Sequence, residues 1–164
     1  MIILGFDPGL ATMGFGVIST DGHKHKLVDY GVISTPAKMP TPVRLRNIFS
    51  DVCTVIDRYK PDAIAVEELF FNNNTTTAIN VAQARGVLLA AASLKTSELY
   101  EYTPLQIKQA IVGYGRADKH QVQQMVMHFL SLDKVPRPDD AADGLAAAIC
   151  HAHSGKLGAQ FKIK

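Results

Sequence analysis

The sequence predicts an α/β protein built on one mixed β-sheet with helices packed against it. Three short strand patterns come first and are separated by turn signals, which favours an antiparallel meander. A strand, a helix and a second strand follow, an order typical of a right-handed crossover between parallel strands. The remaining patterns are mostly helical. This order indicates antiparallel strands first and parallel strands after them, and not a regular alternation of strands and helices.

The opening meander is predicted from three apolar stretches and two turns. The first stretch is a continuous apolar run that ends on Asp7, and Pro8-Gly9 then turns the chain. Asp21-Gly22 is a hairpin signal between the second stretch and the third. The expected strands are residues 2–7, 14–19 and 26–34.

The crossover is predicted from a helical stripe followed by a buried strand. Apolar residues recur at helical spacing over residues 43–59, and Pro61 stops the helix. Residues 63–67 form a continuous apolar run that ends on Glu67, again an acid. Residues 70–77 are expected to form a polar loop that starts with two phenylalanines.

The second half of the chain is predicted to be mainly helical. Thr103 is an expected N-cap, with Pro104 at the first helical position, and Asp118 is expected to cap the next helix. A short basic tail is expected from about residue 154. The predicted elements are a short strand at residues 99–102 and helices at residues 78–94, 104–112, 118–132 and 139–153.

Length and composition predict a single globular domain over residues 1–164. Hydrophobic residues make up 47% of the chain, which is enough for a core and argues against disorder. The 17 basic and 15 acidic residues give a formal charge of +2. This near balance excludes a polycation of the histone type. It does not exclude nucleic-acid binding, because the distribution of charge matters more than its sum.

Cysteine usage and hydropathy predict a soluble, cytoplasmic protein. Cys53 and Cys150 lie far apart in apolar surroundings and without metal-ligand spacing, so we expect buried free thiols in a reducing compartment. No apolar run approaches the roughly 18 residues needed to span a bilayer. The first strand follows Met1 without the charged segment of a secretion signal. We therefore expect no membrane partner.

Four carboxylates are the most informative residues. Asp7 and Glu67 each end an apolar strand, and ligand sites in open α/β sheets form beyond the carboxyl ends of strands. Asp140 and Asp143 lie three residues apart at the start of the last helix, so they share one face. Clustered carboxylates repel one another unless a cation lies between them, and Mg²⁺ prefers oxygen ligands. The acids therefore predict a magnesium site, and two ions about 4 Å apart would suit in-line displacement at phosphorus.

Simpler explanations exist for each acid taken alone. An Asp after a strand is often only a turn residue, and an acidic pair at a helix N-terminus complements the helix dipole without a metal. Asp7-Pro8-Gly9, followed by Gly14 and Gly16, is also similar to the phosphate loop of actin-like ATPases and sugar kinases. Those enzymes contain two such lobes, whereas 164 residues have room for one.

Five motifs stand in order along the chain: GFDPGLATMGFGVI (5–18), AVEELFF (65–71), QARGVLLAA (83–91), KQAIVGYGRADKHQVQ (108–123) and DAADGLAAAI (140–149). With these motifs the chain resembles the RuvC family, the bacterial Holliday-junction resolvases, from Ile2 to about His153. The resemblance implies an RNase H-like fold and a homodimer that acts on four-way DNA junctions with Mg²⁺ or Mn²⁺. It further implies symmetric nicking of two strands, with 5′-phosphate and 3′-hydroxyl ends, and a branch-migration helicase as partner.

The resemblance also assigns roles to individual residues. The family's four catalytic, metal-binding acids match Asp7, Glu67, Asp140 and Asp143. Asp7, central to the sheet, is expected to contact both ions. Lys108 and Lys119 match functional lysines of the family and are expected to contact DNA phosphates, and Phe70 matches an aromatic that interacts with DNA bases. The helix at residues 78–94, which is rich in small side chains, is expected to contribute to the dimer interface.

Several positions have alternatives. Glu68 stands beside Glu67, and only one of them can face the site because side chains alternate along a strand; motif alignment favours Glu67. Asp139 competes in the same way with Asp140, which the spacing of the D-A-A-D motif favours. The histidines show no metal-ligand spacing, and His151 is expected at the surface or helix end.

Two other functions are compatible with the sequence. Another RNase H-like nuclease, acting on RNA or on RNA–DNA hybrids, would carry the same acids. A non-catalytic module that binds junctions would keep the fold, although four intact acids argue against it.

Overall fold

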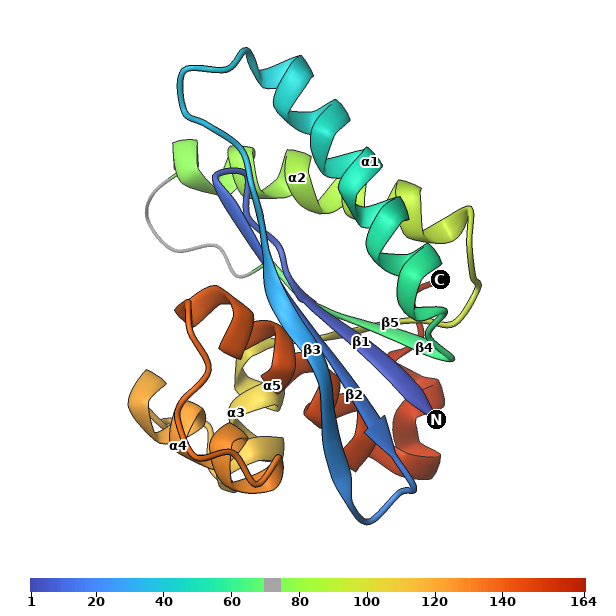
Figure 1. Cartoon of the computed structure of the whole chain (residues 1–164), viewed down its shortest axis with the longest axis vertical. Coiled ribbons are helices and arrows are strands. Elements are labelled where there is room, and N and C mark those ends of the chain that lie inside the picture. The colour runs from blue at the N-terminus through green and yellow to red at the C-terminus, as the bar shows by residue number, and fades with distance from the viewer. Residues whose placement is uncertain (70–74) are drawn as a thin grey trace.

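The computed structural model describes residues 1–69 and 75–164, and it contains a five-stranded sheet in the order β3-β2-β1-β4-β5 (Figure 1). β1 pairs antiparallel with β2 and parallel with β4, and β4 pairs parallel with β5. The predicted mixed sheet is thus confirmed. The strands are β1 (Ile2–Asp7), β2 (Thr12–Thr20), β3 (His25–Ser34), β4 (Ala63–Glu67) and β5 (Leu99–Tyr102).

Helices cover both faces of this sheet. α1 and α2 lie together on one face, and α5 lies across the other with α3 and α4 beside it (Figure 1). Capping boxes at Thr103 and Asp118 start α3 and α4, as expected. The helices are α1 (Thr41–Tyr59), α2 (Thr75–Ser93), α3 (Pro104–Val112), α4 (Lys119–Phe129) and α5 (Asp139–Ser154), followed by a 3-10 helix, η1 (Gly155–Phe161). Within residues 1–69 and 75–164, none of the helices has the length and apolar character required to cross a membrane.

Three helix boundaries differ from the prediction by two residues or more. α1 begins two residues early, at Thr41, because Pro42 is well suited to a first helical turn. α2 begins at Thr75, inside the segment expected to be a loop, since the weak helix preference of threonine is only a prior. α4 ends at Phe129, because Ser131 adopts a left-handed backbone (φ 51°) that a right-handed helix cannot continue.

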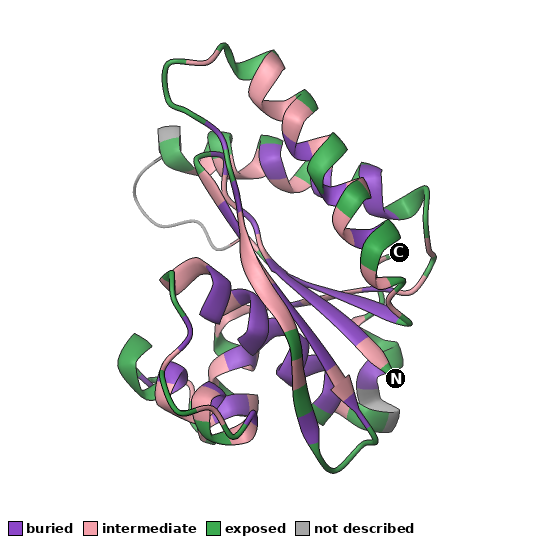
Figure 2. Ribbon diagram, viewed as in Figure 1, coloured by how far each residue is buried: buried purple, intermediate pink, exposed green. Residues whose placement is uncertain are grey.

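The sheet separates two layers of core. β1 is buried on both faces, which explains its unbroken apolar sequence (Figure 2). Leu4 and Phe6 pack in the layer beneath α1 and α2, whereas Ile3 packs in the layer beneath α5. The strand that ends on Asp7 is therefore fixed by side chains on both sides.

α5 approaches the sheet more closely than side chains would permit. A Cβ at Gly5 would lie 2.1 Å from the carbonyl oxygen of Gly144, and one at Gly16 would lie 2.5 Å from the backbone nitrogen of Leu145. At Gly14 the same atom would meet the backbone carbonyl of the first turn of α5 at 1.8 Å. The glycines that are similar in sequence to a phosphate loop thus allow α5 to rest on β1 and β2, backbone against backbone.

Gly5→Ala is expected to destabilise the protein by about 3 kcal/mol, because the new Cβ would overlap backbone atoms of α5. Urea unfolding measures this change. Gly86→Ala in α2 is the matched control, since a Cβ there has open space around it; this variant should be neutral or gain up to about 1 kcal/mol. Equal effects of the two substitutions would show that α5 does not rest directly on β1.

The C-terminal segment is not the simple basic tail that was expected. Phe161 of η1 packs on the ring of Tyr102, and Lys162 forms a β-bridge with Tyr100. His151 is buried, and its Nδ1 lies 2.7 Å from the Tyr102 hydroxyl. His151 lies in the last turn of α5, so the expectation of a helix-end position is confirmed, whereas a surface position is wrong because β5 and η1 cover the last turns of α5.

The two cysteines differ in burial. Cys150 is buried on α5, as expected, and both thiols are free. Cys53 on α1 is only partly buried, so the expectation of full burial was wrong there. Its position on α1 packs it at the rim of the core layer and not inside it.

Candidate active site

Asp7 and Glu67 meet at one edge of the sheet. They are the last residues of β1 and β4, which run parallel side by side with Phe6 opposite Val66. Since both strands are buried apolar runs, their carboxyl ends are the first places where the sheet admits a polar side chain. The structure therefore brings these two sequence-predicted acids together.

α5 brings the other two acids to the same edge. It begins at Asp139, and the close approach of Gly14 sets the position of Asp140 beside the start of β2. Asp143, one turn later, is half-buried and lines the same cavity as Asp7. Asp140 lies near enough to Asp7 to contribute to raising the pKa of that carboxyl. All four predicted acids thus gather around the end of β1.

A cavity of about 320 Å³ opens over these acids. Asp7, Glu67 and Asp143 line it together with two cations, Lys108 of α3 and Lys119 at the start of α4. The sequence predicted these five residues, but it missed the apolar wall between them. That wall consists of Pro104, Ile107, Val122 and Ala146. The helical spacing of apolar residues in α3 and α4 was the sequence signal that could have indicated this wall.

Asp140 faces a second, neighbouring cavity of about 350 Å³. This cavity lies between the turn after β1 and the first turns of α2, and Thr12 and Asn80 are among its lining residues. The acid cluster therefore has open space on two sides. A strand of a polymeric substrate could continue from one cavity into the other.

The acids are held in surroundings that oppose their negative charge. Burial is the main cause and the neighbouring carboxylates add to it, so the pKa of Asp7 is raised to about 8. Burial, with help from Asp143, raises the pKa of Glu67 to about 7, although Lys108 and Lys119 act in the opposite direction. The pKa of Asp143 is also raised, chiefly by burial. Near neutral pH the cluster therefore retains protons that a bound cation would replace.

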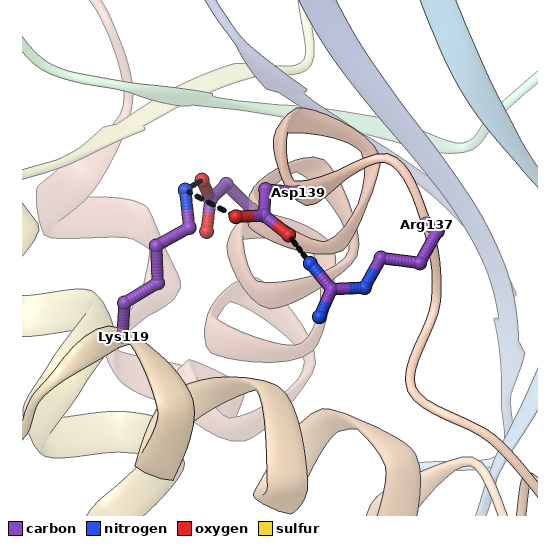
Figure 3. A network of polar contacts seen from close by, with 4 residues as sticks. Lys119, Arg137 and Asp139 are labelled. Atoms are coloured by element: carbon purple, nitrogen blue, oxygen red, sulfur yellow. Dashed lines mark hydrogen bonds and ion pairs between the residues drawn. The ribbon is translucent and has the colours of Figure 1, made fainter.

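Lys119 neutralises part of this charge. Its Nζ donates to Asp143 Oδ2 at 2.9 Å and lies 3.7 Å from Asp139 Oδ2 (Figure 3). Arg137 pairs with the other oxygen of Asp139, so these charges link the N-terminal ends of α4 and α5. The Lys119 side chain is 52% exposed, which leaves its ammonium accessible to a phosphate.

The donor set suits a divalent metal ion. Four carboxylates converge on one sheet edge, and the raised pKa values of Asp7, Glu67 and Asp143 show that their charge is poorly compensated. Such hard oxygen donors are the ligands that Mg²⁺ prefers. Among the residues that the structure describes, no three Asp, Glu, His or Cys side chains already converge closely enough to hold an ion. The residues therefore fit a metal by their chemistry, and ligation would require their side chains to close on it.

The geometry distinguishes the acids that the sequence left open. Glu67 lines the cavity, whereas Glu68 is exposed and its backbone N–H donates to the carbonyl oxygen of Tyr102 at 2.8 Å. Asp139 is paired with Arg137 at the outer end of α5. This arrangement favours Glu67 over Glu68 as the acid of the site, and it indicates that Asp139 forms an ion pair.

The expected DNA-contacting residues differ in what can be said of them. Lys108 and Lys119 line the cavity, as befits phosphate contacts. Phe70 lies outside the residues that the structure describes, so its role stays a prediction. On the opposite face of the sheet, Ile79 of α2 is 60% exposed, and Leu94, directly after the last residue of α2, is 71% exposed.

The fold and the site together define a class. A mixed sheet in the order β3-β2-β1-β4-β5, with carboxylates at the ends of β1 and β4 and on α5, is the arrangement of an RNase H-like protein. The sequence model of one family, described as Crossover junction endodeoxyribonuclease RuvC, matches residues 3–151. The chain belongs to this family, RuvC, whose members are metal-dependent nucleases.

Individual relatives support this assignment over the whole chain. The RuvC protein of Alkaliphilus metalliredigens is 57% identical over 164 residues and covers 100% of both chains. That of Clostridioides difficile is 56% identical over 162 residues, which are 99% of this chain and 96% of the relative.

Solved structures agree with the sequence comparison. T. thermophilus RuvC in complex with a Holliday junction substrate has a TM-score of 0.90 and 38% identity, with 96% of each chain covered. The yeast mitochondrial Holliday junction resolvase Ydc2 has a TM-score of 0.69 at 13% identity, with 98% of this chain and 81% of that chain covered; it shares the fold.

Proposed function

We propose that this protein is an endonuclease that resolves four-way DNA junctions by nicking two strands symmetrically, leaving 5′-phosphate and 3′-hydroxyl ends. The observation that carries the proposal is a cavity lined by three acids and two lysines, with the fourth acid, Asp140, beside it, in a chain of the RuvC family. The names of its relatives and the junction bound to T. thermophilus RuvC support the substrate.

The proposed cofactor is Mg²⁺ or Mn²⁺, with two ions in each site. Asp7, Glu67, Asp140 and Asp143 would hold them. When bound, such ions supply Lewis-acid activation and charge stabilisation for the attack of water on a phosphodiester. The raised pKa values of Asp7 and Glu67 imply that the acids lose protons as ions bind, so metal affinity should rise with pH through neutrality.

The remaining residues of the cavity position the substrate. Lys108 and Lys119 would bind the oxygens of the scissile phosphate, and a fixed positive charge there also stabilises the charge that develops during the reaction. Ile107 and Val122 form a wall that limits the access of bulk water. The lower local polarity strengthens each contact between a lysine and a phosphate.

The proposed assembly is a homodimer of single-domain subunits, each formed by residues 1–164. Two identical sites related by a two-fold axis would cut opposing strands, so the symmetry of the dimer would account for symmetric nicking. α2, with its exposed Ile79 and with the exposed Leu94 directly after its last residue, is the proposed interface. A branch-migration helicase is the proposed partner on junctions, and the cytoplasm, where a bacterial chromosome recombines, is the proposed location.

The deciding experiment incubates the purified protein with a synthetic mobile four-way junction and Mg²⁺. Paired nicks that DNA ligase can reseal are the expected products. Preferred cleavage of an RNA–DNA hybrid duplex would instead indicate another RNase H-like nuclease. Tight junction binding with neither cleavage nor a calorimetric metal-binding signal would indicate a non-catalytic binding module.

Phe70→Ala is expected to slow junction cleavage by roughly tenfold, because a base that stacks on an aromatic side chain gains about 1–3 kcal/mol. Single-turnover cleavage at saturating protein measures the effect. Metal binding, followed by calorimetry, should be unchanged because the carboxylates are intact. A turnover rate equal to that of the unsubstituted protein would exclude a role for Phe70 in holding the junction.

A further inference from the structure

Another open cavity, of about 650 Å³, lies at the other end of α4 from the acids. It is bounded by the turn and first residues of β3 on one side and by the C-terminal end of α4 on the other (Figure 1). We call it the hairpin groove. Its lining residues are His23, Lys24, His25, Lys26, Leu27, His128, Phe129, Leu130 and Ser131.

The hairpin groove is lined by basic side chains. Lys24 and Lys26 are exposed at its rim, and none of the described residues that line it is acidic. Two acids, Asp29 and Asp21, each lie two residues from this lining along the hairpin. Asp29 Oδ2 accepts the hydroxyl of Tyr59, and Asp21 Oδ1 accepts the backbone N–H groups of His23 and Lys24 at 2.9 and 2.8 Å. The Asp21 carboxylate is therefore committed to the turn, and the groove presents net positive charge.

Packed rings support the floor of the groove. His25 is buried, and its Nδ1 lies 2.9 Å from Thr20 Oγ1. Its ring centroid is 6.4 Å from that of Phe129 and 5.0 Å from that of His153 on α5. The hairpin is thus attached to α4 and α5 by side chains, so the rim lysines are carried on a defined surface. Burial, aided by His153, lowers the pKa of His25, so the positive charge of the groove comes from Lys24 and Lys26.

α4 sets the distance between the groove and the acids. Lys119, at its first residue, lines the active-site cavity, and His128, near its last, lines the hairpin groove. A helix of 11 residues is about 16.5 Å long at a rise of 1.5 Å per residue. Successive phosphates of B-DNA advance by about 3.4 Å along the axis, so this span corresponds to four or five base pairs. The segment from α4 to α5, which carries Lys134 and Arg137, runs between the two places (Figure 1).

We propose that the hairpin groove binds the phosphate backbone of one duplex arm of the junction, four or five base pairs from the cleaved bond. This inference rests on the proposed function, because it takes the strand at the acids to be DNA. The groove offers positive charge without the carboxylates of the active site, so it holds DNA but cannot cut it. Contacts of this kind position a duplex and do not depend on its sequence.

The first test removes the rim charges. The double variant Lys24→Ala/Lys26→Ala is compared with Lys38→Ala/Lys164→Ala, which loses the same charge beyond the opposite end of β3 and at the C-terminus. Junction affinity is measured by fluorescence anisotropy across salt concentrations, in Ca²⁺ to prevent cleavage. The rim variant should lower the steepness of the log–log salt dependence by about 0.9 for each lost phosphate contact. A dependence identical to that of the control variant would overturn the proposal.

The second test locates the contact on the DNA. Single methylphosphonate linkages, which remove one phosphate charge, are placed along an arm. Linkages four or five base pairs from the cut should weaken binding by the unsubstituted protein and leave the rim variant unaffected, whereas linkages at the cut should weaken both equally. An equal effect of the distal linkages on both proteins would refute the groove as their binding site.

Cleavage separates this inference from the proposed function. At saturating junction, the rim variant should cut within about twofold of the unsubstituted rate, because its acids and cavity lysines are intact. If the rim variant shows the predicted loss of salt dependence but the unsubstituted protein cuts no junction, the proposed function is wrong and the groove proposal is supported. If it cuts normally and the rim variant matches the control in both binding tests, the groove fails alone.

Discussion

Asp7→Asn is expected to reduce junction cleavage by more than about 1000-fold while leaving junction binding nearly unchanged. Asp7 ends the central strand, and all three other acids contribute to raising the pKa of its carboxyl, so its loss is expected to remove a shared metal ligand. Binding relies on basic groups that the substitution does not touch. Gel-shift titration in Ca²⁺ and single-turnover cleavage in Mg²⁺ measure the two properties separately. Normal Mg²⁺-dependent cleavage by this variant would contradict the assigned metal site.

The same substitution should stabilise the metal-free protein. The pKa of Asp7 is raised by burial and by neighbouring carboxylates to about 8, from an ordinary value of 3.8, so the folded state disfavours the charged form. This penalty is absent below about pH 4, grows as the pH rises, and is complete above about pH 8. Asparagine removes it, so the gain in melting temperature should be larger at pH 8 than at pH 5, with about 2–4 °C for each kcal/mol recovered.

Magnesium provides the control for this stability effect. Mg²⁺ should raise the melting temperature of the unsubstituted protein by binding the folded acids, and it should do so much less for Asp7→Asn. If Asp7→Asn is less stable than the unsubstituted protein at pH 8 without metal, the charge of the Asp7 carboxylate must be stabilised by a partner in the folded state.

Glu67→Gln should reduce cleavage by about 100-fold or more, whereas Glu68→Gln should change it by less than about twofold. The two residues are adjacent, but Glu67 lines the cavity and its pKa is raised to about 7, chiefly by burial. Glu68 is exposed beside the β4–β5 ladder. Single-turnover rates at saturating Mg²⁺ provide the comparison.

The pair of variants is its own matched control. Both substitutions replace one carboxylate by an amide of the same shape, so they differ only in which side of the strand they alter. A large loss at position 68 with little change at position 67 would mean that β4 presents the opposite set of side chains to the cavity.

The strands and most helices were predictable because local signals agree with the final packing. β1 and β4 read as continuous apolar runs since both faces are covered, and Thr103 and Asp118 carry the capping chemistry that starts α3 and α4. The acids were predictable because strand ends and a three-residue helical spacing place them by simple geometry. In the structure all four acids lie at one edge of the sheet.

The features that could not be predicted from the sequence depend on contacts between distant segments. Nothing near His151 indicates that β5 and η1 will cover it. The role of Gly5, Gly14 and Gly16 in the close packing of α5 is visible only when the helix is docked, whereas in the sequence Gly14 and Gly16 indicated only a similarity to a phosphate loop. The apolar wall of the cavity was missed for a related reason: helical spacing shows that a residue faces inward but not which cavity it lines.

The backbone contact between α5 and the sheet divides the active site into two mechanical parts. Asp140 and Asp143 belong to a helix that packs directly on the main chain of β1 and β2. They therefore form one rigid body with Asp7, and their distances from Asp7 stay constant. Lys108 and Lys119 are carried by α3 and α4, which contact α5 through apolar side chains such as Ile107 and Val122 and through the ion pair from Lys119 to Asp143. The cations are therefore connected to the acids through side chains, whereas α5 and the strands are connected backbone to backbone. Such a division would let the protein follow the uneven backbone of a branched DNA while the spacing of its carboxylates stays constant.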